Sequence, residues 1–241
     1  LPVRTASEAS MMVDNIIDYE NNPPIAALNQ QSLYVADNND VIFQAILNNL
    51  MDFTPPAMGS AMAYLPGGEA PVDLPSAAEV SATTSAIING FDAGSLAAIY
   101  LGHGNVTLWA SEKIFEHTTN PPSGGSVRLD LNLLANSGNM SFLMALNCIN
   151  GYFVDLAAAG SGHADYSLAE ESLRRPNRGA IASYAPSALG QLSDYDSISY
   201  ELFNHLFVEG MTTLGPASVT AVLDAISVFG IMQPLYGVPI R

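Results

Sequence analysis

Short apolar runs alternate along this chain with longer segments in which apolar residues recur at helical spacing. We predict a short buried strand that runs into a polar loop within 32–40, and further strands at 60–65, 96–101, 142–148 and 179–185. We predict helices at 5–20, 41–51, 76–91, 129–135, 167–175, 194–207 and 217–229. Strands that are apolar on both faces and alternate with helices indicate a mainly parallel sheet with helices on both faces. The fold class is therefore α/β.

Two helix starts carry a capping-box pattern, in which a hydroxyl side chain precedes a glutamate by three positions. Thr5 and Glu8 form one such pair, and Ser76 and Glu79 form the other. The first helix also has an apolar stripe, which we expect to face the core; its members are Ala9, Met12, Val13, Ile16 and Ile17.

We expect one domain over residues 1–241, because no internal repeat and no long Pro/Ser linker divides the chain. The sequence opens at Leu1 rather than methionine and shows no signal peptide. It is therefore interpreted as a piece excised from a longer secreted precursor.

The charge is strongly one-sided, with 23 acidic against 7 basic residues and a net charge of −16. Such a surface repels phosphate, which argues against a nucleic-acid partner, and it suits a secreted or cell-surface protein. Acidic segments at 37–40 and 193–196 could supply oxygen ligands for calcium, although neither fits an EF-hand loop. No apolar run reaches the roughly 18 residues of a membrane span. A single cysteine excludes an internal disulfide framework.

Candidate chemistry gathers where predicted strands end, which is where open parallel sheets bind ligands. The segment Asp37–Asp40 follows the first strand, His103 lies between two glycines after another, and Cys148 ends a third. His103 precedes Cys148 by 45 residues, close to the roughly 50 that separate histidine and cysteine in caspases. Taken alone, each could be structural; together they indicate a cysteine–histidine pair. His205, by contrast, matches no ligand pattern and is expected on a helix surface.

The segments "IYLGHGNVTLWA" and "FLMALNCINGYF" resemble the gingipain family of cysteine peptidases, which has a caspase-like fold. The shared features are a strand followed by Gly-His-Gly with a nearby tryptophan, and a strand that ends in Cys-x-Asn-Gly. The opening "LPVRTASEASMMVDNIIDYE" and the later "SLAEESLRRPNRGAIASYAPS" also resemble that family, so the likeness spans nearly the whole chain.

The resemblance implies a role for each matching residue. Cys148 would attack a peptide carbonyl to form an acyl-enzyme, and His103 would protonate the leaving amine and then activate water. The backbone N–H groups of Gly104 and Cys148 would form the oxyanion hole. Asp37, which follows the first strand, is the best match for a group that orients the histidine. No cofactor is required.

The resemblance also points to a substrate pocket, occupied by a protein or peptide chain. Asp40 is the best match for an acid that holds a basic side chain, so we expect cleavage after a basic residue. Trp109, Leu101, Leu146 and Leu189 match positions around the pocket. Two departures bear on the substrate: Asn147 stands where alanine is frequent, and Ala188 and Leu189 stand where arginine-specific members carry a tryptophan.

Two other functions remain open at this stage. One is a catalytically silent scaffold that keeps the fold and binds partners; retention of both His103 and Cys148 argues against it. The other is a sortase-type transpeptidase of a secretion system, which would pass the same acyl-enzyme to an amine. Metal hydrolases, phosphate-loop proteins and Gly-x-Ser-x-Gly hydrolases lack their motifs here.

Overall fold

The computed structural model describes residues 2–23, 31–68, 73–119, 121, 125–153 and 166–229. They group into two compact units, one formed by Leu1–Leu47 with Pro56–Leu189 and the other by Asn48–Pro55 with Gly190–Arg241. Each unit is described by itself. The single-domain organisation expected from the sequence stays a prediction.

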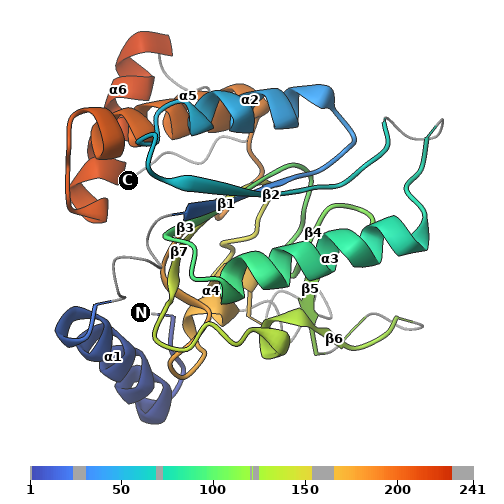
Figure 1. Ribbon diagram of the computed structural model, residues 1–241. Helices are drawn as coiled ribbons and strands as arrows, with labels where there is room; N and C mark the ends of the chain where they lie inside the picture. Colours follow the sequence, from blue (N-terminus) through green and yellow to red (C-terminus); the bar gives the residue numbers. More distant parts are fainter. Residues whose placement is uncertain are drawn as a thin grey trace. The chain divides into compact units, whose positions relative to one another are not determined.

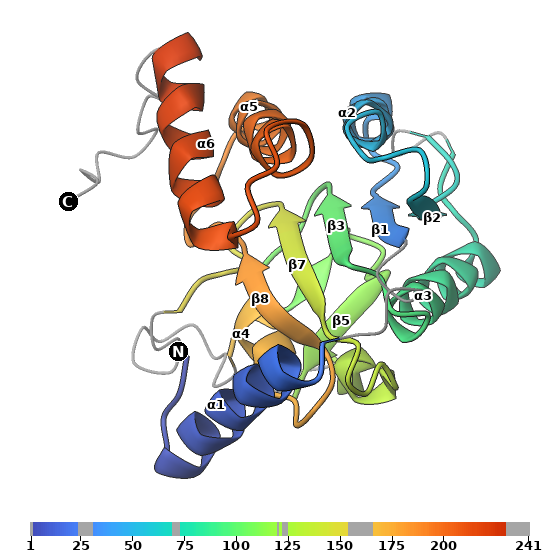
Figure 2. The same cartoon turned by 60° about the vertical axis from the view of Figure 1, so that its left-hand side comes forward.

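The first unit is built on a five-stranded sheet in the order β2-β1-β3-β7-β8, in which every neighbouring pair is parallel (Figure 2). The strands are β1 (Gln31–Ala36), β2 (Gly59–Tyr64), β3 (Ala97–Leu101), β7 (Ser141–Leu146) and β8 (Ala180–Tyr184). This confirms the predicted parallel sheet. Because β2 and β3 flank β1 on opposite sides, the chain changes its winding direction between β1 and β3. Ligand sites of open α/β sheets lie at such a point.

Helices flank this sheet, and α2 (Val41–Met51) and α3 (Ala77–Asp92) lie over opposite faces (Figure 1). The other helices of the first unit are α1 (Ala6–Asn21) and α4 (Leu168–Leu173). Both predicted capping boxes are present, and Ser167 with Glu170 forms a third at the start of α4. Each box satisfies backbone N–H groups that a helix start would otherwise leave unpaired.

The predicted stripe of α1 is wrong in part. Val13 and Ile17 are 42% and 50% exposed, whereas Met12 and the polar Asn15 are buried. Asn15 is buried because its amide donates to the carbonyl of Arg175 at 2.8 Å and accepts from the N–H of Asn177 at 2.8 Å. Contacts with the chain before β8 therefore decide which face of α1 is covered.

A small antiparallel sheet was not predicted. It consists of β4 (Leu108–Trp109), β5 (Phe115–Thr118) and β6 (Arg128–Leu129). The predicted helix at 129–135 is instead a 3₁₀ turn, η1 (Asp130–Leu133). Strands of two to four residues are too short to show periodicity, so only their pairing reveals them.

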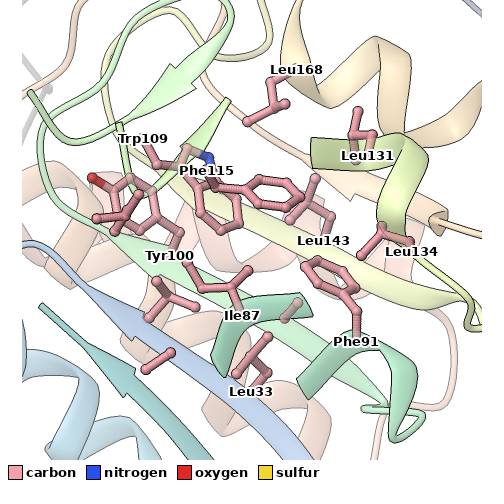
Figure 3. Packing of buried hydrophobic residues seen from close by; sticks show 14 of the residues in the cluster. Leu33, Ile87, Phe91, Tyr100, Trp109, Phe115, Leu131, Leu134, Leu143 and Leu168 are labelled. Carbon is pink, nitrogen blue, oxygen red and sulfur yellow. The ribbon is translucent and has the colours of Figure 1, made fainter. Parts of the chain in front are cut away.

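The core of the first unit joins one face of the main sheet to α3 and the small sheet (Figure 3). Tyr100 and Trp109 stack with their ring centroids 4.5 Å apart, and Phe115 lies 5.0 Å from the Trp109 ring. Apolar side chains from the surrounding elements pack around this aromatic group: Leu33, Ile87, Phe91, Leu131, Leu134, Leu143 and Leu168. Full burial of such side chains stabilises the fold by about 1.5–3 kcal/mol each.

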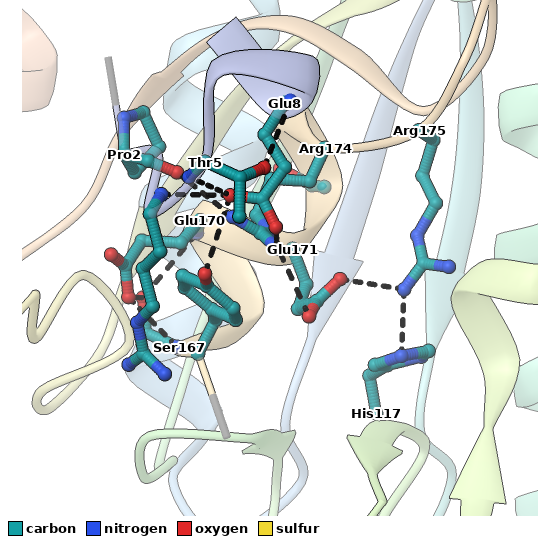
Figure 4. Close-up of polar contacts among 12 residues, drawn as sticks. Pro2, Thr5, Glu8, His117, Ser167, Glu170, Glu171, Arg174 and Arg175 are labelled. Carbon is teal, nitrogen blue, oxygen red and sulfur yellow. Dashed lines mark hydrogen bonds and ion pairs between the residues drawn. The ribbon is translucent and has the colours of Figure 1, made fainter. Parts of the chain in front are cut away.

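Polar contacts attach α4 to its neighbours (Figure 4). Arg174 pairs with Glu8 of α1 at 2.5 Å, and this hydrogen bond is the largest cause that lowers the pKa of Glu8 to about 2. Arg175 contacts Glu171 and the His117 ring, both at 2.7 Å. His117 belongs to β5, so α4 is tied both to the first helix and to the small sheet.

The second unit contains α5 (Leu192–Phe203), a π-helical turn η2 (Asn204–Val208) and α6 (Leu214–Phe229). His205 is 3% exposed, so the expectation of a surface position is wrong. Its Nδ1 lies 2.7 Å from Glu209 and its Nε2 lies 3.0 Å from Asp224. The described part of this unit contains no lysine or arginine. Through these two contacts, the His205 ring joins η2 to α6.

This contact predicts a pH-dependent stability. The hydrogen bond with Glu209 raises the pKa of His205, and Asp224 adds to the effect. Because the pKa of His205 is higher in the folded state than in the unfolded state, protonation of His205 stabilises the fold. This contribution is fully present below the unfolded-state pKa of about 6.5 and is lost as pH rises through the folded-state pKa. We expect the difference in melting temperature between wild type and His205→Gln to be largest near pH ~6 and smaller near pH ~9.

Glu209→Gln is the matched control for this prediction, because it removes the main partner of His205 while keeping the histidine. The pH-dependent loss of stability should be complete at a lower pH in Glu209→Gln than in wild type, because the folded-state pKa of His205 is then raised less. A melting-temperature difference that does not change with pH would contradict the assignment.

Candidate active site

The parallel register places His103 and Cys148 at equivalent positions. Leu101 of β3 pairs with Leu146 of β7, and each candidate residue follows its paired leucine by two positions. Neighbouring strands lie about 4.8 Å apart. His103 is exposed and Cys148 is half-buried, so both can be reached from solvent. The pair predicted from the sequence therefore lies at one edge of the sheet, at adjacent strand ends.

Asp37 is buried and bonds the main chain of the loop that follows β3 and carries His103, the histidine loop. Its Oδ2 accepts a hydrogen bond from the backbone N–H of His103 at 2.9 Å, and its Oδ1 accepts from the N–H of Asn38 at 2.7 Å. The His103 ring makes an edge-to-face contact with Phe43 of α2, with centroids 5.7 Å apart. Asp37 thus acts on the backbone of His103, while an aromatic ring contacts the imidazole.

Glycine is required on both sides of His103 because the loop passes close to other atoms. A Cβ at Gly102 would lie 2.2 Å from the Cβ of Asp37, and one at Gly104 would lie 2.1 Å from Nδ2 of Asn147. At these distances, a side chain at Gly102 or Gly104 would displace its neighbours, which are Asp37 and Asn147. The asparagine before Cys148 therefore fits against the glycine after His103.

Two backbone N–H groups of the site remain available as hydrogen-bond donors to a ligand. The N–H groups of Gly104 and Cys148 donate no hydrogen bond to any residue in the described ranges. The turn after Cys148 is held from the other side, because the N–H of Ile149 donates to Ala188 at 3.2 Å and that of Gly151 to Pro186 at 2.9 Å. Free N–H groups at a strand end are suited to bind a carbonyl or oxyanion.

Aromatic residues support the histidine loop from below. The hydroxyl of Tyr100 hydrogen-bonds the carbonyl of His103 and accepts from the N–H of Ala110 at 2.9 Å. Burial, and secondly the charge of Asp37, raise the pKa of Tyr100 well above its ordinary value, so the hydroxyl keeps its proton. Trp109 is fully buried against this ring. Trp109 therefore lies in the core under the histidine loop and does not form an exposed wall of the expected substrate pocket.

The residues expected around the substrate differ in their exposure to solvent. Leu101 and Leu146 are 0% and 2% exposed within the sheet, whereas Leu189 is 55% exposed beyond β8. Asp40 is partly buried, and its Oδ1 accepts from the N–H of Ile42 at 2.9 Å at the start of α2. Among the three leucines, only Leu189 offers open surface to a ligand.

One group in the described residues has side chains that could hold a metal ion. Glu201, His205 and Asp224 of the second unit bring ligand atoms within 4.8 Å of one another. The calcium site expected at 37–40 stays a prediction. In that segment, the carboxylates of Asp37 and Asp40 accept hydrogen bonds from backbone N–H groups. None of the helices in the described ranges is long and apolar enough to cross a membrane.

Three residues that shape the site have no role predicted from the sequence. Phe43 contacts the histidine ring, Tyr100 holds the carbonyl of His103, and Asn150 bonds the histidine loop. A signal exists only for Asn150, which forms part of the Cys-x-Asn-Gly motif. Phe43 and Tyr100 are ordinary apolar positions of a helix and a strand, so local sequence gives no hint of their role.

A parallel α/β sheet with a histidine and a cysteine at adjacent strand ends defines the architecture of caspase-like cysteine peptidases. The chain belongs to peptidase family C25, whose model matches residues 1–234. This confirms the family that the motifs suggested.

Solved structures give the same fold. The arginine-specific cysteine proteinase gingipain R (RgpB) matches with a TM-score of 0.70 and 19% identity, over 94% of this chain and 49% of that one. A complex of pro- and mature domains of Porphyromonas gingivalis RgpB matches with a TM-score of 0.69 and 19% identity, over 94% and 50%. The chain thus spans about half the length of these relatives. Among curated proteins, no sequence is significantly similar to it.

Proposed function

We propose that this chain carries the catalytic machinery of a secreted or cell-surface cysteine endopeptidase. The observation that carries the proposal is the register of β3 with β7, which sets His103 and Cys148 two residues beyond the paired Leu101 and Leu146. Membership in peptidase family C25 supports the same chemistry. The substrate is a protein or peptide chain.

In the proposed reaction, His103 takes the thiol proton of Cys148 as the sulfur attacks the scissile carbonyl carbon, and the carbonyl electrons move onto oxygen. The free N–H groups of Gly104 and Cys148 stabilise that oxyanion. Collapse of the intermediate breaks the C–N bond, and His103 protonates the departing amine, which leaves a thioester on Cys148. His103 then takes a proton from water, which attacks the thioester; the C–S bond breaks, the proton passes to the sulfur, and the acid and the thiol are released.

Asp37 and Tyr100 have supporting roles in this scheme. Together they bond the backbone N–H and the carbonyl of His103, so the main chain of the catalytic histidine is fixed on both sides. A fixed main chain keeps the imidazole near the strand end of Cys148. Holding reactants in geometry is a large part of the rate that enzymes supply.

An activity-based probe tests the proposal. The chain is treated with a peptidyl acyloxymethyl ketone, and the labelled residue is identified by mass spectrometry. We expect labelling of Cys148 that native peptide substrate suppresses and that His103→Ala slows. Absence of labelling, with the protein folded, would favour the silent scaffold. Product analysis with an added amine acceptor separates hydrolysis from transpeptidation.

We further propose cleavage after arginine or lysine, with the basic group held by Asp40. The net charge of −16 favours cationic substrates at long range. Asp40 also bonds the Ile42 N–H at the start of α2, so Asp40→Ala would remove a helix cap together with the charge. Asp40→Asn is the sharper variant, because an amide oxygen can keep the cap.

On a fluorogenic panel with Arg, Lys, Asn, Asp and Leu at the cleavage position, Asp40→Asn should lower kcat/KM for Arg and Lys by about 10–100-fold. Rates for Leu should change little. A preference of wild type for Leu or Asp, or a basic preference that Asp40→Asn leaves intact, would contradict the role of Asp40.

A further inference from the structure

We propose that Asn150 is a positioning residue that fixes the cysteine turn against the histidine loop. This inference rests on the proposed peptidase function and goes beyond it. Asn150 follows Cys148 by two residues and is fully buried. Its Oδ1 accepts from Nε1 of Trp109 at 3.1 Å, and its Nδ2 donates to the carbonyl of Asn105 at 2.9 Å. One side chain therefore joins the two loops that carry the reacting groups.

The partners of Asn150 belong to a loop that its own backbone hydrogen bonds close. Within it, Ala110 N–H donates to the carbonyl of His103 at 2.9 Å, and Asn105 N–H donates to Leu108 at 3.1 Å. Trp109 closes the loop by pairing with Gly104, and its ring is buried in the core. Asn150 therefore bonds to both ends of a turn whose position relative to His103 is already set.

The cysteine turn needs such an anchor because its backbone is strained. Ile149, between Cys148 and Asn150, has a φ of 50°, in the left-handed region that β-branched residues avoid. Backbone strain of this kind persists only where surrounding contacts determine the conformation. The carbonyl of Asn150 also accepts from the N–H of Ala169 in α4 at 3.2 Å. Without the side chain of Asn150, the turn could relax and move the sulfur of Cys148.

The direct test compares Asn150→Ala with Asn136→Ala. Asn136 is 1% exposed and also makes two buried amide hydrogen bonds, to the N–H and the carbonyl of Gly179 at 2.8 and 2.9 Å, at the opposite end of β8. Both variants should lower the melting temperature. Assayed well below both melting temperatures, Asn150→Ala should lower kcat by about 10–100-fold with little change in KM, because a shift of about 1 Å can cost 10² in rate. Asn136→Ala should keep kcat within about twofold of wild type.

Trp109→Phe provides a second variant should Asn150→Ala not fold. It keeps an aromatic ring over Tyr100 but removes the N–H that Asn150 accepts. We expect a smaller loss of kcat than in Asn150→Ala, and a double variant less impaired than the product of the two single losses, since both break one connection. Unchanged kcat in Trp109→Phe, or equal kcat losses in Asn150→Ala and Asn136→Ala, would overturn the proposal.

Alkylation of Cys148 by iodoacetamide at fixed pH separates this proposal from the proposed function, since it does not require peptide hydrolysis. His103 can take the thiol proton as the sulfur reacts, so Asn150→Ala, which breaks the connection between the two loops, should slow alkylation toward the rate of His103→Ala, and Asn136→Ala should not. Lack of hydrolysis by wild type would defeat the peptidase function while this comparison still decides the role of Asn150. Equal alkylation rates in wild type and Asn150→Ala would reject that role.

Discussion

Replacement of Cys148 by alanine is expected to abolish peptide hydrolysis, with a loss of kcat on the order of 10⁶, the loss seen when a peptidase loses its nucleophile. The remaining groups of the site can bind and polarise a carbonyl, but they cannot form the thioester. The measurement is hydrolysis of a fluorogenic peptide library, followed by determination of kcat and KM for the best substrate.

The fold should survive this substitution. Cys148 is half-buried and carries one small side chain beyond the end of β7, so we expect its truncation to cost less than about 1 kcal/mol of unfolding free energy. Circular dichroism and hydrolysis should therefore diverge. Cys148→Ser, which keeps the size of the side chain, serves as the control. Retained hydrolysis in Cys148→Ala would place the nucleophile elsewhere and remove the basis for the mechanism.

Replacement of His103 by alanine is expected to lower kcat by about 10²–10⁴ while KM stays nearly unchanged. The reason is that a proton donor acts mainly in the transition state, where the amine leaves and where water attacks. His103 is exposed and holds its place through backbone bonds to Asp37 and Tyr100. Truncation of the ring should leave those bonds, and hence the loop, intact.

Chemical rescue checks that the ring itself is responsible. Because His103 faces solvent, added imidazole can reach the vacated position and should restore part of the turnover in His103→Ala but not in Cys148→Ala. A variant with normal turnover would make His103 a structural residue. A variant with raised KM and normal kcat would make it a binding residue.

Local patterns in the sequence determined most of the secondary structure and the choice of His103 and Cys148 as the candidate pair. Apolar runs that stop at glycine or at Asn150 marked the strand ends, and the capping boxes at Thr5 and Ser76 marked two helix starts. These features depend on residues only a few positions apart. The motifs around His103 and Cys148 were also local, and they identified the family that the comparison confirms.

Contacts between distant segments decided how the candidate site residues lie relative to one another and which polar side chains are buried. Whether His103 lies opposite Cys148 depends on the register of β3 against β7, and the burial of His205 depends on Asp224 in another helix. Asp37 bonds the main chain of His103 rather than its ring because the two strand ends meet at one level of the sheet. Asn150 looks like a turn residue until the histidine loop is folded over it. Hydrogen bonds of this kind join atoms that only the packed chain brings together, so no pattern along the sequence records them.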